Sequence, residues 1–405
     1  MQFTEEHELF RATVREFVQK EVEPYVGEWE ERGMFPAHEL FPKLAALGLL
    51  GLEYDPAYGG EGADHWYTVV AAEEFGRHCS ANAVLMAWCV QAYMATPSLH
   101  EHGSEDLKQR FLVPSIKGEL VSSIAVTEPD AGSDVAGLRT RARRDGDEWV
   151  ITGSKTYITN AVQGDWLCLL ARTSDEGGHR GMSQIIVPTS TPGVTVSRSL
   201  RKLGNRASDT AELVFDEARV PVENTIGTIG RGFQQQMAQF QVERLSAVYY
   251  GVGQMETAIT RTVEWLRNRA AFGGRLIDNQ YLQYNLAELA GEVEMLRQLA
   301  YSCAELIVAG KDVTVRASAA KLHAGRLIRR VADTCIQYHG GMGYMHENWT
   351  SRFFRDVRLL SIAGGGDEAM LRVLSRELVN GKFFAPPGPA RPTARPAGEG
   401  KTAAS

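Results

Sequence analysis

Two short segments gather hydroxyl, glycine and aromatic side chains at the ends of apolar runs. Residues 124–134 follow an apolar stretch that begins at Val121, and residues 155–160 come after a short connection. Where glycine leaves no Cβ in the way, backbone N–H groups approach a flat heteroaromatic ligand closely, so both segments could line one ligand site. Two ordinary turns have the same composition, and spacing alone does not separate these interpretations.

Glu243 and Arg244 form a charged pair with catalytic potential on a predicted amphipathic helix. At ~100° per residue, Arg244 falls near the centre of the apolar stripe of this helix and Glu243 near its edge. The stripe consists of Phe233, Met237, Phe240, Ala247, Val248, Gly251 and Met255. An unpaired buried charge is costly, so the pair needs a partner, a ligand or water. A salt bridge at the helix edge, with Glu243 facing solvent, is the alternative that the pattern leaves open.

The elements that position these residues belong to a chain of 405 residues, which is long enough for two or three domains. Its apolar fraction of 44% and charged fraction of 23% are typical of a water-soluble globular protein. The net charge of −7, from 43 basic and 50 acidic residues, disfavours non-specific binding to nucleic acid. Composition therefore indicates a globular protein and argues against a nucleic-acid binding protein.

The five cysteines have no Cys-x-x-Cys spacing and an odd count, which is typical of reduced thiols in a cytosol-like compartment. The sequence has no zinc-binding signature and no apolar run of the ~18 residues that a membrane span requires. Its first residues are acidic and do not resemble an export signal. We therefore expect a cytoplasmic protein without a bound metal.

Hydrophobic periodicity divides the chain into helical, β-rich and helical parts. Apolar residues recur at helical spacing from Thr4, the expected N-cap, to about Lys117. The period shortens between about 119 and 223, where strands separated by glycine-containing turns are predicted within 149–215. We predict an N-terminal helical domain at 1–118, a middle β domain at 119–225, a C-terminal helical bundle at 226–384 and a disordered tail at 385–405.

Five motifs, in the same order along the chain, resemble those of the acyl-CoA dehydrogenase family of flavoenzymes. They are AVTEPDAGSD at 125–134, KTYITN at 155–160, RAAFG at 269–273, IQYHGGMGY at 336–344 and RDVRLLSIAGGG at 355–366. The resemblance covers roughly residues 1–380. It implies an α+β acyl-CoA dehydrogenase fold, with an N-terminal helical domain, a middle β-barrel-like domain and a C-terminal four-helix bundle.

The resemblance also implies a reaction in which a carboxylate removes the α-proton of an acyl thioester and the β-hydrogen leaves as hydride to flavin N5. In much of the family the base is a Glu in the loop after the Arg-Asp motif, but the matching residue here is Gly364. The isovaleryl-CoA and long-chain branches place the base in a Glu-Arg pair on a C-terminal-domain helix, which Glu243 and Arg244 match. Glu243 is therefore the implied base, and loss of the chemistry is the alternative.

FAD is the implied cofactor. The residues that match its binding positions in the family are Ile124, Val126, Thr127, Tyr157, Ile158 and Thr159 at the ring, and Arg269, Phe272, Gln280, Gln337, Gly340, Gly341, Gly366 and Glu368 toward the diphosphate and adenine. Those that match substrate positions are Ser133, Arg244, Gly364 and Gly365, with the backbone N–H of Gly364 at the thioester oxygen. Because FAD sites in this family are shared between subunits, the resemblance implies a homotetramer built as a dimer of dimers.

The segments at 239–245 and 364–368 are similar to those of citronellyl-CoA dehydrogenases within the branch that includes isovaleryl-CoA dehydrogenases. A glycine at 364 leaves space around the acyl chain, so we expect a branched or terpenoid acyl-CoA as substrate and electron-transfer flavoprotein as electron acceptor. Two alternatives stay open. One is a dehydrogenase or oxidase acting on an acyl thioester bound to a carrier protein, and the other is an inactive acyl-CoA-binding homologue.

Overall fold

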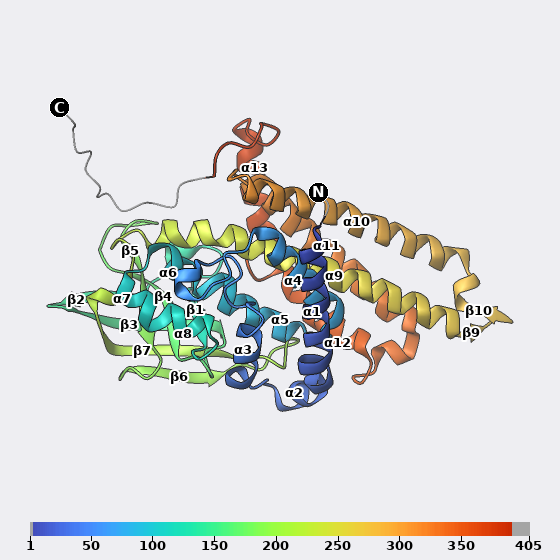
Figure 1. Ribbon diagram of the computed structural model, residues 1–405, viewed down its shortest axis with the longest axis horizontal. Helices are drawn as coiled ribbons and strands as arrows, with labels where there is room; N and C mark the ends of the chain where they lie inside the picture. The colour runs from blue at the N-terminus through green and yellow to red at the C-terminus, as the bar shows by residue number, and fades with distance from the viewer. Residues whose placement is uncertain (1–2, 391–405) are drawn as a thin grey trace.

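The computed structural model describes residues 3–390 as three consecutive parts, with helices at both ends of the chain and a sheet between them (Figure 1). The sheet lies at one end of the molecule, and the long helices α9 and α10 run toward the other end. The predicted order of helical, β and helical parts is confirmed.

Capping residues begin the helices of the N-terminal part. Thr4 accepts a hydrogen bond from the N–H of His7 and its own N–H donates to the His7 ring, which confirms Thr4 as the N-cap of α1. Asp64 caps α4 through the N–H of Trp66. The helices are α1 (Glu5–Phe17), α2 (Val26–Arg32), α3 (Ala37–Ala45), α4 (His65–His78), α5 (Asn82–Cys89), α6 (Pro97–His102), α7 (Glu105–Leu107) and α8 (Val113–Ile116).

The middle part is a single sheet whose strands follow the order β6-β7-β3-β2-β4-β5-β8, with β1 added in parallel to β4. The strands are β1 (Ser122–Ala125), β2 (Arg141–Asp145), β3 (Glu148–Thr159), β4 (Trp166–Arg172), β5 (Met182–Pro188), β6 (Val194–Ser199), β7 (Thr210–Pro221) and β8 (Thr225–Ile226). Alternating apolar side chains such as Ile151, Leu169 and Leu213 form its core. The strands predicted within 149–215 are all present.

The C-terminal part is a helical bundle arranged around α11. Its elements are α9 (Gly232–Asn268), the hairpin β9 (Ala270–Ala271) and β10 (Gly274–Arg275), α10 (Gln280–Val308), α11 (Thr314–His339), α12 (Trp349–Val357) and α13 (Asp367–Val379). Helix α11 contacts α9, α10, α12 and α13, and α9 also packs against α4. The N-terminal helices and the bundle therefore share one apolar core.

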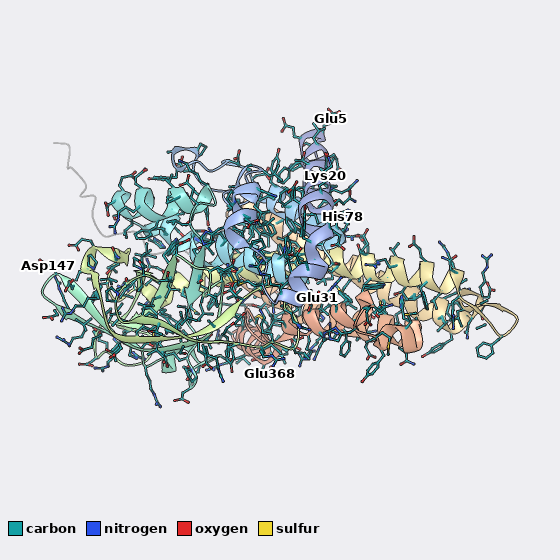
Figure 2. All side chains as sticks on the ribbon, turned by 90° about the horizontal axis from the view of Figure 1, so that it is seen from below. Glu5, Lys20, Glu31, His78, Asp147 and Glu368 are labelled. Atoms are coloured by element: carbon teal, nitrogen blue, oxygen red, sulfur yellow. The ribbon has the colours of Figure 1, made fainter. Side chains whose placement is uncertain are left out.

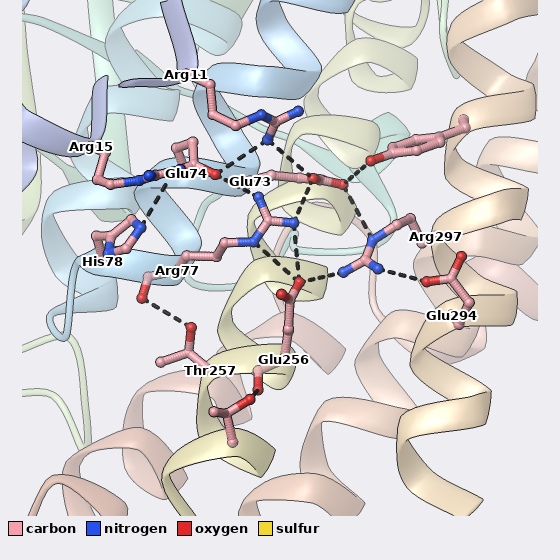
Figure 3. A network of polar contacts seen from close by, with 12 residues as sticks. Arg11, Arg15, Glu73, Glu74, Arg77, His78, Glu256, Thr257, Glu294 and Arg297 are labelled. Carbon is pink, nitrogen blue, oxygen red and sulfur yellow. Dashed lines mark hydrogen bonds and ion pairs between the residues drawn. The ribbon is translucent and has the colours of Figure 1, made fainter. Parts of the chain in front are cut away.

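An ion-pair network joins α1, α4, α9 and α10 (Figure 3). At its centre the buried Glu73 accepts hydrogen bonds from Arg77, at 3.0 Å, and from the hydroxyl of Tyr301, at 2.9 Å. Arg77 also bonds Glu256 on α9, and Arg297 on α10 bonds the same carboxylate. Since each buried charge has partners of opposite sign, the network fixes the N-terminal helices on the bundle.

The segment predicted as a disordered tail, 385–405, begins with residues that have backbone partners. The N–H of Asp312 donates to the carbonyl of Gly388, and the N–H of Ala390 donates to that of Gly310. These contacts place residues 388–390 against the turn after α10. Residues 391–405 lie outside the described residues.

Candidate active site

Glu243 lies inside the molecule on the first part of α9. The residue is only 5% exposed, and within the described chain its Oε2 has no hydrogen-bond partner. Burial raises the pKa of Glu243 to about 7, although the charges of Arg244 and Lys321 act to lower it. A buried carboxylate with a free oxygen and such a pKa is suited to accept a proton from a ligand.

The buried face of α9 differs from the predicted stripe. Arg244, predicted near the centre, is half-buried, whereas Glu243, predicted at the edge, is buried. Half-buried members of the stripe are Phe233, Met237 and Phe240, while Gln235, Gln236 and Gln239 are buried. The second half of the stripe, Ala247, Val248, Gly251 and Met255, is buried as predicted. In the first half glutamines face the interior, and Gln239 accepts a hydrogen bond from Ser98 of α6 at 2.7 Å.

The loop between α12 and α13 brings Gly364 and Gly365 against the Glu243–Arg244 pair. A Cβ on Gly364 would lie 3.2 Å from Oε1 of Glu243, and one on Gly365 would lie 3.5 Å from Nε of Arg244. Both glycines have left-handed φ angles, +63° and +87°, which favour glycine. The Glu243 carboxylate thus fills the place where a side chain at 364 would begin, so part of the space expected for the acyl chain is taken.

The backbone N–H of Gly364 is a second functional group at this place. Among the hydrogen bonds of residues 3–390, none has this N–H as donor. A free backbone donor beside a buried base is the combination that proton removal next to a carbonyl requires, because negative charge develops on the carbonyl oxygen. The structure thus brings together Glu243, Arg244, Gly364 and Gly365 from two distant parts of the sequence.

The two strand-end segments singled out in the sequence lie side by side. The N–H of Thr156 donates to the carbonyl of Thr127 at 2.9 Å. Lys155, which is fully buried, donates to the carbonyl of Val126 at 2.8 Å and to Oε1 of Glu128 at 2.9 Å. Burial lowers the pKa of Lys155 to about 8, and the charge of Glu128 opposes this effect. This ion pair fixes the end of β3 against the turn that follows β1.

Tyr157 projects from the end of β3. Its side chain is largely open, at 69% exposure, and its φ angle is +62° at a bulge in the pairing of β3 with β7. A bulky residue at positive φ is strained, and such strain persists where the surroundings hold it, often at ligand sites. The ring forms an open aromatic surface at the strand end.

The neighbouring side chains differ in how they can reach a ligand. Ile124, Thr127 and Thr159 are half-buried, Val126 and Ile158 are buried, and Ser133 is exposed. Ile158 belongs to the core of the sheet, so only its backbone is available to a ligand. Val126 and Ile124 pack with Phe233 at the start of α9. The strand-end surface therefore adjoins the helix that carries Glu243.

Among the residues expected at the diphosphate and adenine end of FAD, those beside the β9–β10 hairpin lie far from the sheet. Arg269 and Phe272 are in the β9–β10 hairpin, at the opposite end of the molecule from the sheet tip marked by Asp147 (Figures 1 and 2). Phe272 is fully exposed and has a φ angle of +52°. The exposed members of this set also include Gln280, Gln337, Gly340, Gly341 and Glu368, and Gly366 is the N-cap of α13. A single chain therefore does not bring the hairpin residues Arg269 and Phe272 to the sheet.

Sequence reasoning missed two buried cations near the site, Lys321 and Lys155. Lys321 on α11 lies behind the Gly364 loop, and Lys155 pairs with Glu128. One signal was available: Lys321 shares the helix face of Ala317 and Ala324, which are apolar and buried. A lysine on the apolar, buried face of a helix indicates a buried cation that has polar partners.

Some classes of site are absent from the described part of the chain. Residues 3–390 contain no group of His, Cys, Asp and Glu that could hold a metal ion, and no helix among them is long and apolar enough to cross a membrane. The five cysteines are buried and free.

Comparison with known proteins assigns a family. Residues 4–119, 123–218 and 230–379 match, in that order, the N-terminal, middle and C-terminal domains of acyl-CoA dehydrogenase. A probable acyl-CoA dehydrogenase of Bacillus subtilis is 34% identical over 93% of this chain and 99% of its own length. A crystal structure of a putative acyl-CoA dehydrogenase from Mycobacterium smegmatis has a TM-score of 0.90 and 39% identity, covering 95% and 99% of the two chains. A prolyl acyl-carrier-protein oxidase has a TM-score of 0.89 and 25% identity, covering 93% of this chain and all of its own.

The fold and site therefore define a flavin-dependent oxidoreductase. The chain belongs to the acyl-CoA dehydrogenase family, and it is an FAD-dependent acyl-CoA dehydrogenase by that membership. The residues present fit this cofactor. The open ring of Tyr157, with Ile124 and Thr159 beside it, is a platform for a flat ring system, and Arg269 presents an exposed guanidinium for a diphosphate.

Proposed function

We propose that Glu243 is the base for α,β-dehydrogenation of an acyl-CoA thioester in this protein. The observation that carries the proposal is the buried Glu243 carboxylate, with Oε2 unpartnered and Oε1 next to the left-handed Gly364. The absence of a carboxylate at 364 supports it, because this helix supplies an acid where the usual loop position has none.

Each group has a role that follows from its place. Glu243 takes the α-proton, and a pKa near 7 makes it a stronger base than an ordinary carboxylate. The free N–H of Gly364 stabilises the negative charge that develops on the thioester oxygen. Arg244, next to Gly365, supplies positive charge beside the base. When bound, FAD supplies the acceptor for the β-hydride.

The proposed acyl group is branched or terpenoid, as the similarity to the citronellyl-CoA and isovaleryl-CoA branch implies. Since Glu243 occupies part of the space at Gly364, additional room has to come from elsewhere. A cavity of about 320 Å³ lies against Gln239 and Val242 of α9, on the side of α6 and the 49–54 segment. Movement of the Gln239 side chain, one turn before Glu243, would connect it to the base.

We further propose a homotetramer, built as a dimer of dimers, in the cytoplasm. The β9–β10 hairpin, which holds Phe272 and follows Arg269, lies at the opposite end of the molecule from the sheet, whose strand β3 holds Tyr157. This arrangement supports shared FAD sites, because a second chain is needed to cover the cofactor. Family membership supports electron-transfer flavoprotein as the electron acceptor. Size-exclusion chromatography with light scattering measures the assembly, and a monomer with full FAD content would contradict it.

The function is tested by anaerobic bleaching of the flavin with a panel of straight-chain and branched acyl-CoAs. Bleaching by branched substrates is expected, and a preference for straight chains would refute the acyl specificity. Glu243→Gln should keep yellow FAD and bind thioester but lose turnover by at least about 100-fold. Glu264→Gln, an exposed residue on the same helix, is the matched control and should keep full activity. Retained turnover in Glu243→Gln would refute Glu243 as the base.

A second candidate is a dehydrogenase or oxidase of a carrier-protein-bound thioester. The similarity in fold and sequence to a prolyl acyl-carrier-protein oxidase supports this second candidate. Comparing kcat/KM for the same acyl group on CoA and on a carrier protein separates the two candidates. An enzyme for carrier-bound thioesters would have the higher kcat/KM with the carrier protein. An inactive homologue would show no bleaching with any thioester.

A further inference from the structure

Lys321 is a buried cation on α11 that has no role in the reaction as proposed so far. The residue is 2% exposed, and its Nζ donates to the carbonyls of Leu360 at 2.5 Å, Ala363 at 3.0 Å and Gly365 at 3.4 Å. An ammonium group has three hydrogens, so these three carbonyls use all of its donors. No ion pair joins Lys321 to an acid among the described residues.

The three carbonyls belong to the loop that carries Gly364. They stand on both sides of Gly364 in the sequence, so the ammonium draws the backbone before and after it toward α11. The free N–H of Gly364 stands between them in this loop. Its direction is therefore set by the hydrogen bonds of Lys321, because Gly364 and Gly365 have no side chains to hold the loop.

Lys321 also faces the base. A Cβ on Gly364 would lie 3.2 Å from Glu243 Oε1 and 3.8 Å from Cε of Lys321, so the carboxylate and the lysine stem meet at this glycine. The other ionisable groups that face Glu243 are Arg244 and Tyr250 on α9 and Cys89 on α5. Burial raises the pKa of the Cys89 thiol to about 12 and raises that of Tyr250 as well, so both stay neutral.

We propose that Lys321 is a positioning residue for the reaction: it orients the Gly364 N–H toward the thioester oxygen, and its positive charge keeps the Glu243 carboxylate ionised. The inference rests on the proposed role of Glu243. One ammonium thus serves both groups of the site, holding the oxyanion donor by hydrogen bonds and the base by charge.

The test compares Lys321→Met and Lys321→Arg as full-length, FAD-loaded enzymes. Methionine keeps the apolar stem but removes the donors and the charge, whereas arginine keeps both. We expect kcat of Lys321→Met to fall about 100-fold, as when an oxyanion donor is lost. The acid limb of its kcat/KM profile should move upward by about 1 pH unit, because a cation no longer favours ionised Glu243.

Lys321→Arg gives a second, independent readout. Burial, with the charge of Arg244, lowers the pKa of Lys321 to about 8, although the charges of Glu243 and of Asp367 on α13 act to raise it. The wild-type enzyme should therefore lose activity above that pH as the ammonium loses its proton. Arginine stays charged, and Lys321→Arg should keep its activity above pH 8. If Lys321→Met does not fold or bind FAD, this alkaline limb decides the proposal.

The outcomes separate the two proposals. Unchanged pH limbs in both lysine variants, with turnover abolished in Glu243→Gln, would overturn the role of Lys321 alone. Retained turnover in Glu243→Gln would overturn the proposed base, whatever the lysine variants do. A fall in kcat of Lys321→Met without movement of the acid limb would show only a loss of structure and would also contradict the inference.

Discussion

Replacing Glu243 by glutamine should stabilise the folded protein in a pH-dependent way. Burial raises the pKa of Glu243 from its ordinary 4.5 to about 7, so between these values the folded state holds a proton that the unfolded chain has released. Stability from this group is therefore fully present below pH 4.5 and falls as the pH rises toward 7. At ~1.4 kcal/mol per pH unit, the loss reaches about 3 kcal/mol.

Glutamine has the same shape and does not titrate, so the variant avoids this loss. At pH 7.5 it should be more stable than the wild type by about 3 kcal/mol, and at pH 5 by less than about 1 kcal/mol. For 405 residues and ~2.1 cal/mol/K per residue, Tm should rise by about 4 °C at pH 7.5 and about 1 °C at pH 5.

Scanning calorimetry of the FAD-loaded proteins, at equal concentration and without substrate, measures the difference. Glu264→Gln on the exposed side of the same helix is the control and should change Tm equally little at both pH values. The reasoning is refuted if Glu243→Gln shifts Tm by the same amount at pH 5 and 7.5, since the carboxylate would then be solvated or paired in the folded state.

Two further substitutions test the surroundings of the site, and a third tests the ion-pair network between the N-terminal helices and the bundle. Gly364→Ala adds a Cβ 3.2 Å from Glu243 Oε1 at a left-handed φ, so kcat should fall roughly 10-fold and the folded state should lose about 1–2 kcal/mol of stability. In the control Gly251→Ala, the new Cβ lies in a helix, 3.4 Å from Leu360, and kcat should not change. Equal kinetics in both variants would contradict crowding at Gly364. Lys155→Met leaves Glu128 buried without its cation, so the absorbance of FAD per protein after dialysis should drop; full retention would contradict the link between the two strand ends. Glu74 belongs to the same buried network, and its histidine and arginine partners outweigh burial and lower its pKa to about 2. Glu74→Gln should therefore lower Tm by an amount corresponding to about 3 kcal/mol, and the rim substitution Glu294→Gln by less than about 1 kcal/mol. Similar Tm values would contradict a buried network.

The order of helical, β and helical parts followed from periodicity because each element keeps a single pattern over many residues. Thr4 illustrates how a local signal is enough, since its partner His7 lies within one turn. The strand register around Tyr157 was beyond such reasoning, because the bulge depends on pairing with β7, which lies more than 50 residues later in the chain.

The candidate site divides in the same way. Family motifs indicated Glu243 and Gly364, but only the fold shows that the carboxylate and the glycine are in contact, at 3.2 Å from the position of a Cβ. Helical phase misjudged which of Glu243 and Arg244 is inside, because polar residues such as Gln239, which accepts a hydrogen bond from Ser98 of α6, face the interior in the first part of α9. Lys321 was missed since its acceptors are backbone carbonyls, which leave no mark in the sequence.

The hairpin between α9 and α10 has one more consequence. Phe272 places a full aromatic ring in water on a backbone angle that such a residue rarely adopts, so an isolated chain gains nothing from it. If a neighbouring copy covers that ring, the yellow colour of the enzyme becomes a report on self-association. Dilution would then release oxidised FAD, which is itself yellow, so the protein separated from free cofactor would lose its colour before any helix unfolds.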